Sequence, residues 1–153
     1  MKKLQLQKPQ AAVYASSSSQ PQMPFSGVLE QDMAWLQDCY VRCSDLVYRQ
    51  FTIGGEQGHR AAVFFFDGMT NSRVVHDNIL QPLFIDAELA QYDAENDKKT
   101  QKYFSFLKQH LLPAGEVEST DDLEQGRMAM MNGDVLLLID GCRQGFIIDA
   151  KGF

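Results

Sequence analysis

The chain has few cysteines, a shortage of basic residues and no long apolar run, and each shortage excludes a class of protein. Its three cysteines, Cys39, Cys43 and Cys142, form no even disulfide framework, which favours a reducing, cytosolic location. Lys and Arg number 14 against 20 Asp and Glu, so the net charge of −6 repels nucleic acid, and we expect no such partner. Apolar runs such as Val135 to Ile139 are far shorter than the ~20 residues that cross a bilayer.

The first 25 residues differ in composition from the rest. Residues 1–25 are rich in Gln, Ser and Pro, and they carry three lysines and no acidic residue. Apolar residues do not recur there at a helical or strand spacing, so burial of apolar surface could not offset the conformational entropy lost on ordering. We therefore expect a disordered basic tail. Residues 26–153 are expected to form a single domain, since one core commonly holds about 100–200 residues.

Hydrophobic periodicity predicts four helices and two β-hairpins. Two strands, Ala61–Phe66 and Val135–Ile139, are apolar at every position, which is typical of strands covered on both faces. The fold class is therefore α/β, with a small mixed β-sheet built from two hairpins and packed by helices. The predicted helices are 26–43 with Ser26 as the cap, 72–82 ending at Pro82, 103–111, and 122–132 after a capping box of Ser119 and Asp122; the predicted hairpins are 45–66 and 135–148.

The strongest enzymatic hypothesis concerns Asp67. It follows a buried strand and precedes Thr70, as the nucleophile does in haloacid dehalogenase phosphatases. That chemistry needs a second Asp two residues later to protonate the leaving group, and Met69 stands there instead. Asp-Gly after a strand is ordinary turn chemistry, so we expect no enzyme and no catalytic residue.

Metal and cofactor sites are not indicated either. Cys39 and Cys43 lie four residues apart, but two ligands do not make a zinc site, and the three histidines show no ligand spacing. We therefore expect buried core thiols, no metal and no cofactor.

Several segments, taken in order, resemble the N-terminal soluble region of the spore germinant receptor A subunits, the GerA family. They are Cys43–Phe51, the strand that ends in Phe66-Asp67-Gly68, His76–Leu83, Leu111–Val117 and residues 121–149. Ordered matches over most of a chain are far more specific than one short motif.

This resemblance implies a function without catalysis. Family members act in nutrient-triggered spore germination, so this chain would be the first α/β subdomain of the soluble region, working by subunit contacts and conformational relay. Its implied partners are the B and C subunits, the rest of its own A subunit and other A subunits. Its implied location is the cytoplasmic, spore-core face of the spore inner membrane, with membrane contact only through a downstream segment.

Two alternatives concern the polar residues at strand ends. Asp67, Gly68, Asp140 and Gly141 follow the two apolar strands, and ligands of open α/β sheets gather at strand ends, so they are expected to form an interface or cleft. The module could instead bind a small molecule or ion, with Asp67, Thr70 and Arg49 as polar contacts. Saturable binding by the domain separates the two.

Overall fold

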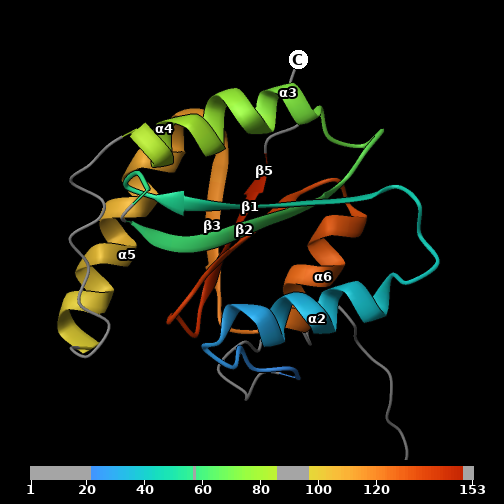
Figure 1. The fold of residues 1–153 in the computed structure, drawn as a ribbon, viewed down its shortest axis with the longest axis horizontal. Helices are drawn as coiled ribbons and strands as arrows, with labels where there is room; N and C mark the ends of the chain where they lie inside the picture. Colours follow the sequence, from blue (N-terminus) through green and yellow to red (C-terminus); the bar gives the residue numbers. More distant parts are fainter. Residues whose placement is uncertain (1–21, 57, 86–96, 150–153) are drawn as a thin grey trace, which may run out of the picture.

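The computed structural model describes residues 22–56, 58–85 and 97–149. Within these residues, five strands form one sheet in the order β1-β2-β4-β5-β3, with helices on both faces (Figure 1). The α/β fold class is confirmed. The elements are α2 (Leu29–Cys39), β1 (Leu46–Ile53), β2 (His59–Phe66), α3 (Ser72–Val75), a π-helical turn (His76–Leu80), α4 (Gln81–Ile85), α5 (Asp97–Leu111), a short 3-10 turn (Leu112–Ala114), β3 (Glu116–Thr120), α6 (Leu123–Met131), β4 (Val135–Ile139) and β5 (Gly145–Asp149).

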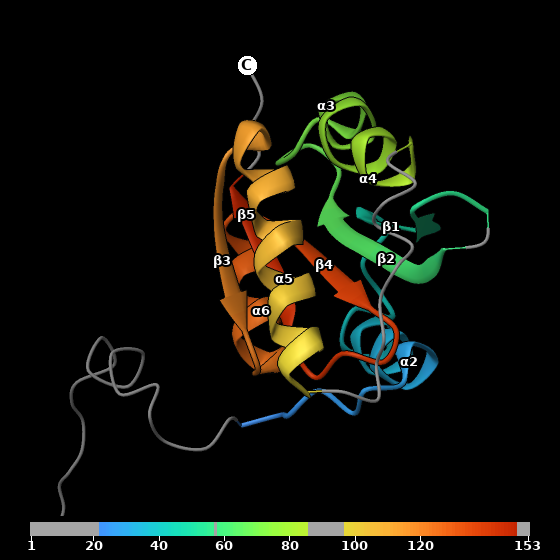
Figure 2. The ribbon, with the colours of Figure 1, turned by 90° about the vertical axis from the view of Figure 1, so that its left-hand side faces the viewer.

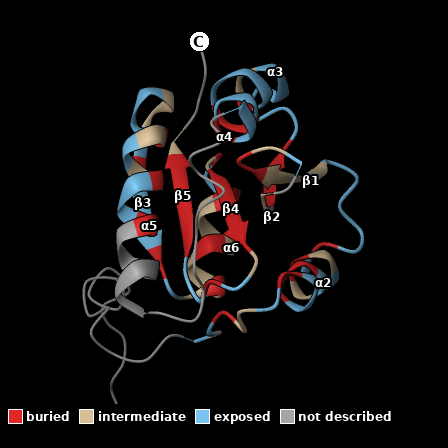
Figure 3. Ribbon diagram, turned by 60° about the vertical axis from the view of Figure 1, so that its left-hand side comes forward, coloured by how far each residue is buried: buried red, intermediate tan, exposed pale blue. Residues whose placement is uncertain are grey.

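The two faces of the sheet bury separate hydrophobic cores. One core contains Val63 and Phe65 of β2 and packs against α3, α4 and α5, whereas Phe64 faces the other core, under α2 and α6. Side chains alternate between faces along a strand, so a strand covered on both sides must be apolar at every position. The buried strands in the centre of Figure 3 confirm that prediction for β2 and β4.

The sheet differs in two details from the expected one. All four pairings between the described strands are antiparallel, where a mixed sheet was expected. The fifth strand, β3, pairs with β5 at the sheet edge and has only Val117 and Thr120 buried, so its sequence lacks the apolar signal of the central strands.

The expected capping box before α6 is wrong, because Ser119 lies within β3 and Asp122 itself caps α6 by accepting from the Glu124 amide at 3.0 Å.

Pro82 does not end the helical segment after β2. The chain passes through a π-helical turn and continues as α4 to Ile85, and Asn71 caps the first turn. Proline has no amide hydrogen to donate, and its ring clashes with the carbonyl of the preceding helical turn. A wider π-helical turn directly before Pro82 accommodates both effects.

The domain begins before the expected boundary. Residues 22–25 were assigned to the disordered tail, but Phe25 is buried, Pro24 forms a β-bridge with Asp122, and the Leu123 amide donates to the Met23 carbonyl at 2.7 Å. Figure 2 shows this segment running beneath the sheet. The remainder of the expected tail lies outside the described residues.

The first helix is shorter than its periodicity predicted. α2 begins at Leu29 after Val28, and the Ser26 side chain bonds to Val28 rather than capping the helix. It ends at Cys39, so Cys39 and Cys43 do not share a helix face, and both thiols are exposed. The expectation that these two thiols are buried in the core is therefore wrong, whereas Cys142 is buried.

Candidate interaction surfaces

The loop after β2, residues 67–70, is largely exposed and is fixed by backbone hydrogen bonds; we call it the exit loop. The Asp67 amide donates to the Asp45 carbonyl at 2.9 Å, and the amides of Met69 and Thr70 donate to the Phe66 carbonyl at 3.2 and 3.1 Å. Gly68 has φ 91°, a conformation that favours glycine, because a side chain there is strained. Asp67, Gly68 and Met69 are therefore held outward by a fixed backbone.

Thr70 anchors the exit loop to the body of the domain. Its side chain is buried, and its hydroxyl donates to the Gly133 carbonyl at 2.6 Å, in the turn between α6 and β4. A buried carbonyl without a partner costs free energy, so this bond fixes the loop against the turn. The hydroxyl is engaged within the domain and does not face a ligand.

Asp140 lies at the opposite end of the sheet from Asp67. β2 and β4 are antiparallel, with Ala61 opposite Ile139 and Phe64 opposite Leu136, so their carboxyl ends point in opposite directions. The Asp140 carboxylate accepts from the Leu29 amide at 3.0 Å and lies 3.5 Å from the Arg60 guanidinium. Asp140 therefore caps the N-terminus of α2. The sequence had predicted Ser26 as this cap, but the acceptor comes from a residue 111 positions beyond Leu29 in the chain.

Gly141 and Arg49 do not join the exit loop. The Gly141 amide donates to the Gly27 carbonyl at 2.9 Å, which ties the β4–β5 turn to the segment before α2. Arg49 is exposed in the middle of β1, opposite Val63. The six sequence-predicted residues therefore form no single site: Asp67, Gly68 and Thr70 lie together, Asp140 and Gly141 lie at the other end, and Arg49 lies between on an edge strand.

A buried carboxyl, Asp32, was missed by sequence reasoning. It lies on the core-facing side of α2, accepts from the Ser26 amide at 3.1 Å, and has its pKa raised by burial, an effect opposed by hydrogen bonds from Ser26 and Gly27. The sequence did carry one sign of this buried acid, because Asp32 lies on the same helix face as the apolar residues Leu29, Met33 and Leu36. Asp32 orders the turn before α2.

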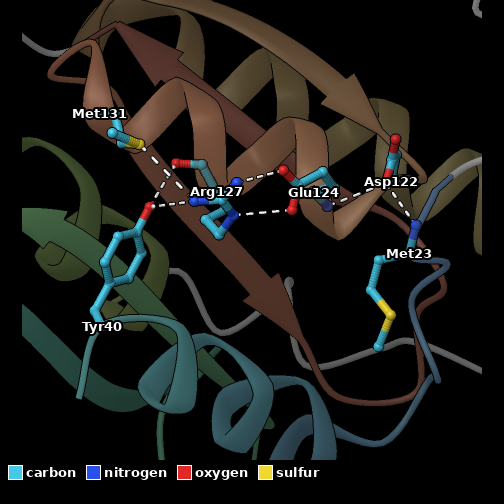
Figure 4. Close-up of polar contacts among 6 residues, drawn as sticks. All are labelled: Met23, Tyr40, Asp122, Glu124, Arg127 and Met131. Atoms are coloured by element: carbon cyan, nitrogen blue, oxygen red, sulfur yellow. Dashed lines mark hydrogen bonds and ion pairs between the residues drawn. The ribbon is translucent and has the colours of Figure 1, made fainter.

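A polar cluster joins α2 to α6, and the sequence did not reveal it (Figure 4). The Arg127 Nε donates to Glu124 at 2.8 Å, and the Tyr40 hydroxyl donates to the Arg127 carbonyl at 3.1 Å. The hydrogen bond to Glu124 is the main cause that raises the pKa of Arg127, whereas burial is the main cause that raises the pKa of Tyr40. Met131, 55% exposed, ends α6 beside this cluster. Because its charges are paired internally, the cluster joins two helices rather than forming a reactive site.

The described residues contain neither a cluster that could hold a metal nor a helix long and apolar enough to span a membrane. Cys39 is exposed overall, yet partial desolvation by its neighbours is the main cause that raises the pKa of its thiol, and this lowers the fraction of reactive thiolate.

The fold matches a solved structure. Its TM-score is 0.66 against the crystal structure of the N-terminal domain of the A subunit of the Bacillus megaterium spore germinant receptor GerK3, at 23% identity over 85% of this chain and 49% of that one. At this level of identity, the match shows a likeness of fold.

Sequence comparison shows the family. Residues 34–153 match the Bacillus/Clostridium GerA spore germination proteins, so the chain belongs to that family. It is 23% identical to spore germination protein KA of Bacillus subtilis, over 71% of this chain, and 24% identical to the uncharacterized membrane protein YfkQ of the same species, over 84%. The matched regions span 18% and 23% of those two relatives.

Proposed function

We propose that this chain is a domain of a spore germinant receptor A subunit that transmits a conformational signal through contacts and does no catalysis. Membership in a family of spore germination proteins supports this proposal, as does the fold it shares with the N-terminal domain of a receptor A subunit. Its partners would be the B and C subunits, the rest of its own A subunit and other A subunits, at the cytoplasmic face of the spore inner membrane.

The observation that carries the proposal is the bond between Thr70 and Gly133. The exit loop presents Asp67, Gly68 and Met69 to a partner, and the Thr70 hydroxyl links that loop to the buried turn between α6 and β4. A partner that displaces the loop must therefore move or break a contact to the core, and discrete packing arrangements carry such changes. Binding at the exposed residues and transmission through Thr70 are separable steps.

Contact through the exit loop is tested in spores whose receptor contains this chain within its full-length A subunit. Met69→Glu places a charge on a side chain that is 49% exposed, and Phe106→Glu does the same at 40% exposure on α5. We expect the Met69 variant to retain less of the B and C subunits on purification, by about tenfold if ~1.4 kcal/mol of contact energy is lost, and to germinate slowly. Equal behaviour of the two variants would show that the exit loop is no contact surface.

Relay through Thr70 is tested with Thr70→Val, which keeps the side-chain shape and removes the hydroxyl. Thr70→Ser is the matched control because it keeps the donor. We expect the valine variant to assemble with its partners but respond weakly to nutrient, and the serine variant to respond normally. A valine variant that assembles and germinates like the parent would overturn the relay.

The ligand-binding alternative is measured separately by amide NMR titration with amino acids, sugars, nucleosides and simple cations. Saturable shifts near Asp67 would make this domain a sensor. The engaged hydroxyl of Thr70 and the distant position of Arg49 argue for the contact proposal instead.

A further inference from the structure

Three exposed apolar side chains lie at the end of the sheet where β2 ends and β4 begins. Val41 is 78% exposed, Met131 is 55% exposed and Met69 is 49% exposed. They come from three segments that are far apart in the sequence, which are the turn after α2, the exit loop and the end of α6. Single exposed apolar residues are common on protein surfaces, whereas a cluster of them marks a site of contact.

The turn after α2 packs against the exit loop. Tyr40, directly before Val41, places its ring edge-on against the Phe66 ring, with 4.9 Å between the two centroids. Phe66 ends β2, and its carbonyl accepts from the Met69 amide at 3.2 Å. This aromatic contact therefore brings the segments that carry Val41 and Met69 together.

The end of α6 joins both of these segments. The Tyr40 hydroxyl donates to the Arg127 carbonyl at 3.1 Å, one helical turn before Met131 (Figure 4). Beyond the helix, the Gly133 carbonyl accepts from the hydroxyl of Thr70 in the exit loop at 2.6 Å. The three segments therefore form one surface at this end of the sheet. We call it the exit-end patch, and its exposed apolar members are Val41, Met69 and Met131.

The chain leaves the sheet beside the exit-end patch. Val135 pairs with Ile148, so Asp134 lies opposite Asp149, the last residue of β5. Met131 stands only three residues before Asp134, and a hydrogen-bonded turn keeps the two close. An extended chain advances about 3.3 Å per residue, so the first ~4 residues after β5 are long enough to reach the patch.

The residues that follow β5 carry side chains that suit this surface. Residues 150–153 contain an aromatic and a basic side chain, Phe153 and Lys151. Methionine thioethers pack favourably against aromatic rings. Beside the patch lie the exposed residues Asp45 and Asp67, joined by a backbone hydrogen bond of 2.9 Å, and their carboxylates are complementary to a lysine. An apolar contact with a polar rim is the usual composition of a protein interface.

We propose that residues 150–153 turn back onto the exit-end patch of the same chain, with the Phe153 ring against Met69 and Met131 and with Lys151 beside the two carboxylates. The docking itself is a contact within one chain and does not depend on the proposed function. Its consequence rests on that function, because the exit loop is then coupled directly to the part of an A subunit that follows this domain. A partner that displaces the exit loop would also release this segment.

Methionine methyl NMR of the whole chain tests the docking with the native patch intact. An aromatic ring that packs on a methyl group shifts its signal, and Phe153→Leu removes the ring while it keeps an apolar side chain. We expect the Met69 and Met131 methyl signals to move in this variant. The Met33 signal is the internal control and should stay in place, because Met33 is buried in the core under α2. Identical Met69 and Met131 signals in parent and variant would overturn the proposal.

The charged part of the contact is tested with Lys151→Glu, which places a third carboxylate beside Asp45 and Asp67. We expect the methyl signals of the patch to move toward their positions in a chain that ends at Asp149, where nothing follows β5. Lys151→Arg keeps the positive charge and is the matched control, which should resemble the parent. Added salt should act in the same direction as the charge reversal. Signals that ignore both the charge reversal and salt would show that Lys151 makes no such contact.

Mixed samples distinguish docking within one chain from docking between two. Labelled Phe153→Leu chains in an excess of unlabelled parent should keep the signals of the variant. A return toward the parent signals would mean that Phe153 binds the patch of another copy, and the docking within one chain would be wrong. Failure of the proposed function is recognised separately. Slow germination of Met69→Glu spores together with unmoved methyl signals would leave the subunit contacts standing and remove only this docking.

Discussion

At the scale of single residues, two Asp-Gly pairs with the same sequence context have different roles. Asp67 makes its described contact through its backbone amide and leaves its carboxylate exposed, whereas Asp140 caps α2 and lies near Arg60. Nothing in the short motif distinguishes them. The difference arises because β2 and β4 run in opposite directions, so their ends meet different elements.

Removing the two carboxylates should therefore have unequal effects on stability. We expect Asp140→Ala to lower the free energy of unfolding by about 1 kcal/mol, the usual cost of a lost helix cap. Asp67→Ala should change it by less than about 0.5 kcal/mol, as exposed substitutions do. Urea denaturation of both variants measures the difference, and Asp140→Asn, which keeps an acceptor oxygen, should recover most of the loss. Equal losses would contradict the cap.

At the scale of elements, the sequence pattern predicted the strands but not how closely their backbones pack. One such close contact is at Gly145. Gly145 begins β5, and a Cβ atom added there would lie 2.6 Å from the Leu137 carbonyl oxygen and 2.9 Å from the Phe25 ring. The glycine thus permits β4, β5 and the segment before α2 to meet. From the sequence, Gly145 was placed in the turn of the 135–148 hairpin, and Phe25 was assigned to the tail.

Gly145→Ala tests this meeting of three segments. Real Cβ atoms do not tolerate such distances, so β5 or Phe25 must shift, and we expect a loss of about 1–3 kcal/mol in the free energy of unfolding. Gln144→Ala, at the exposed neighbouring position, is the control and should be nearly neutral. If both substitutions prove neutral in chemical denaturation, the packing of Phe25 against β5 is wrong.

At the scale of the whole molecule, one sheet separates two cores, and the single domain predicted for residues 26–153 requires them to unfold together. Phe65 is fully buried under α3, α4 and α5, while Trp35 packs against the core on the opposite face. Strands β2, β4 and β5 contribute side chains to both cores. Unfolding of one core therefore exposes the opposite face of the same strands and destabilises the other core. Cooperative unfolding is expected of single domains of this size.

Phe65→Ala should lower stability by about 3–5 kcal/mol, the cost of deleting a buried phenylalanine ring. Trp35 fluorescence and far-ultraviolet circular dichroism should shift together, although Trp35 lies on the other face. Phe106→Ala, at a ring 40% exposed, should cost about 1 kcal/mol or less. Separate transitions for the two signals would show two independently unfolding units.

The sequence by itself determined the fold class, the two apolar hairpins, most helix positions and the family resemblance, because these depend on local period and on ordered motifs. Tertiary structure decided which residues act together. It separated Asp67 from Asp140, engaged Thr70 with Gly133, brought Phe25 into the core and placed β1 at an edge. Strand direction and long-range hydrogen bonds set these outcomes, and neither leaves a mark on the local pattern of residues.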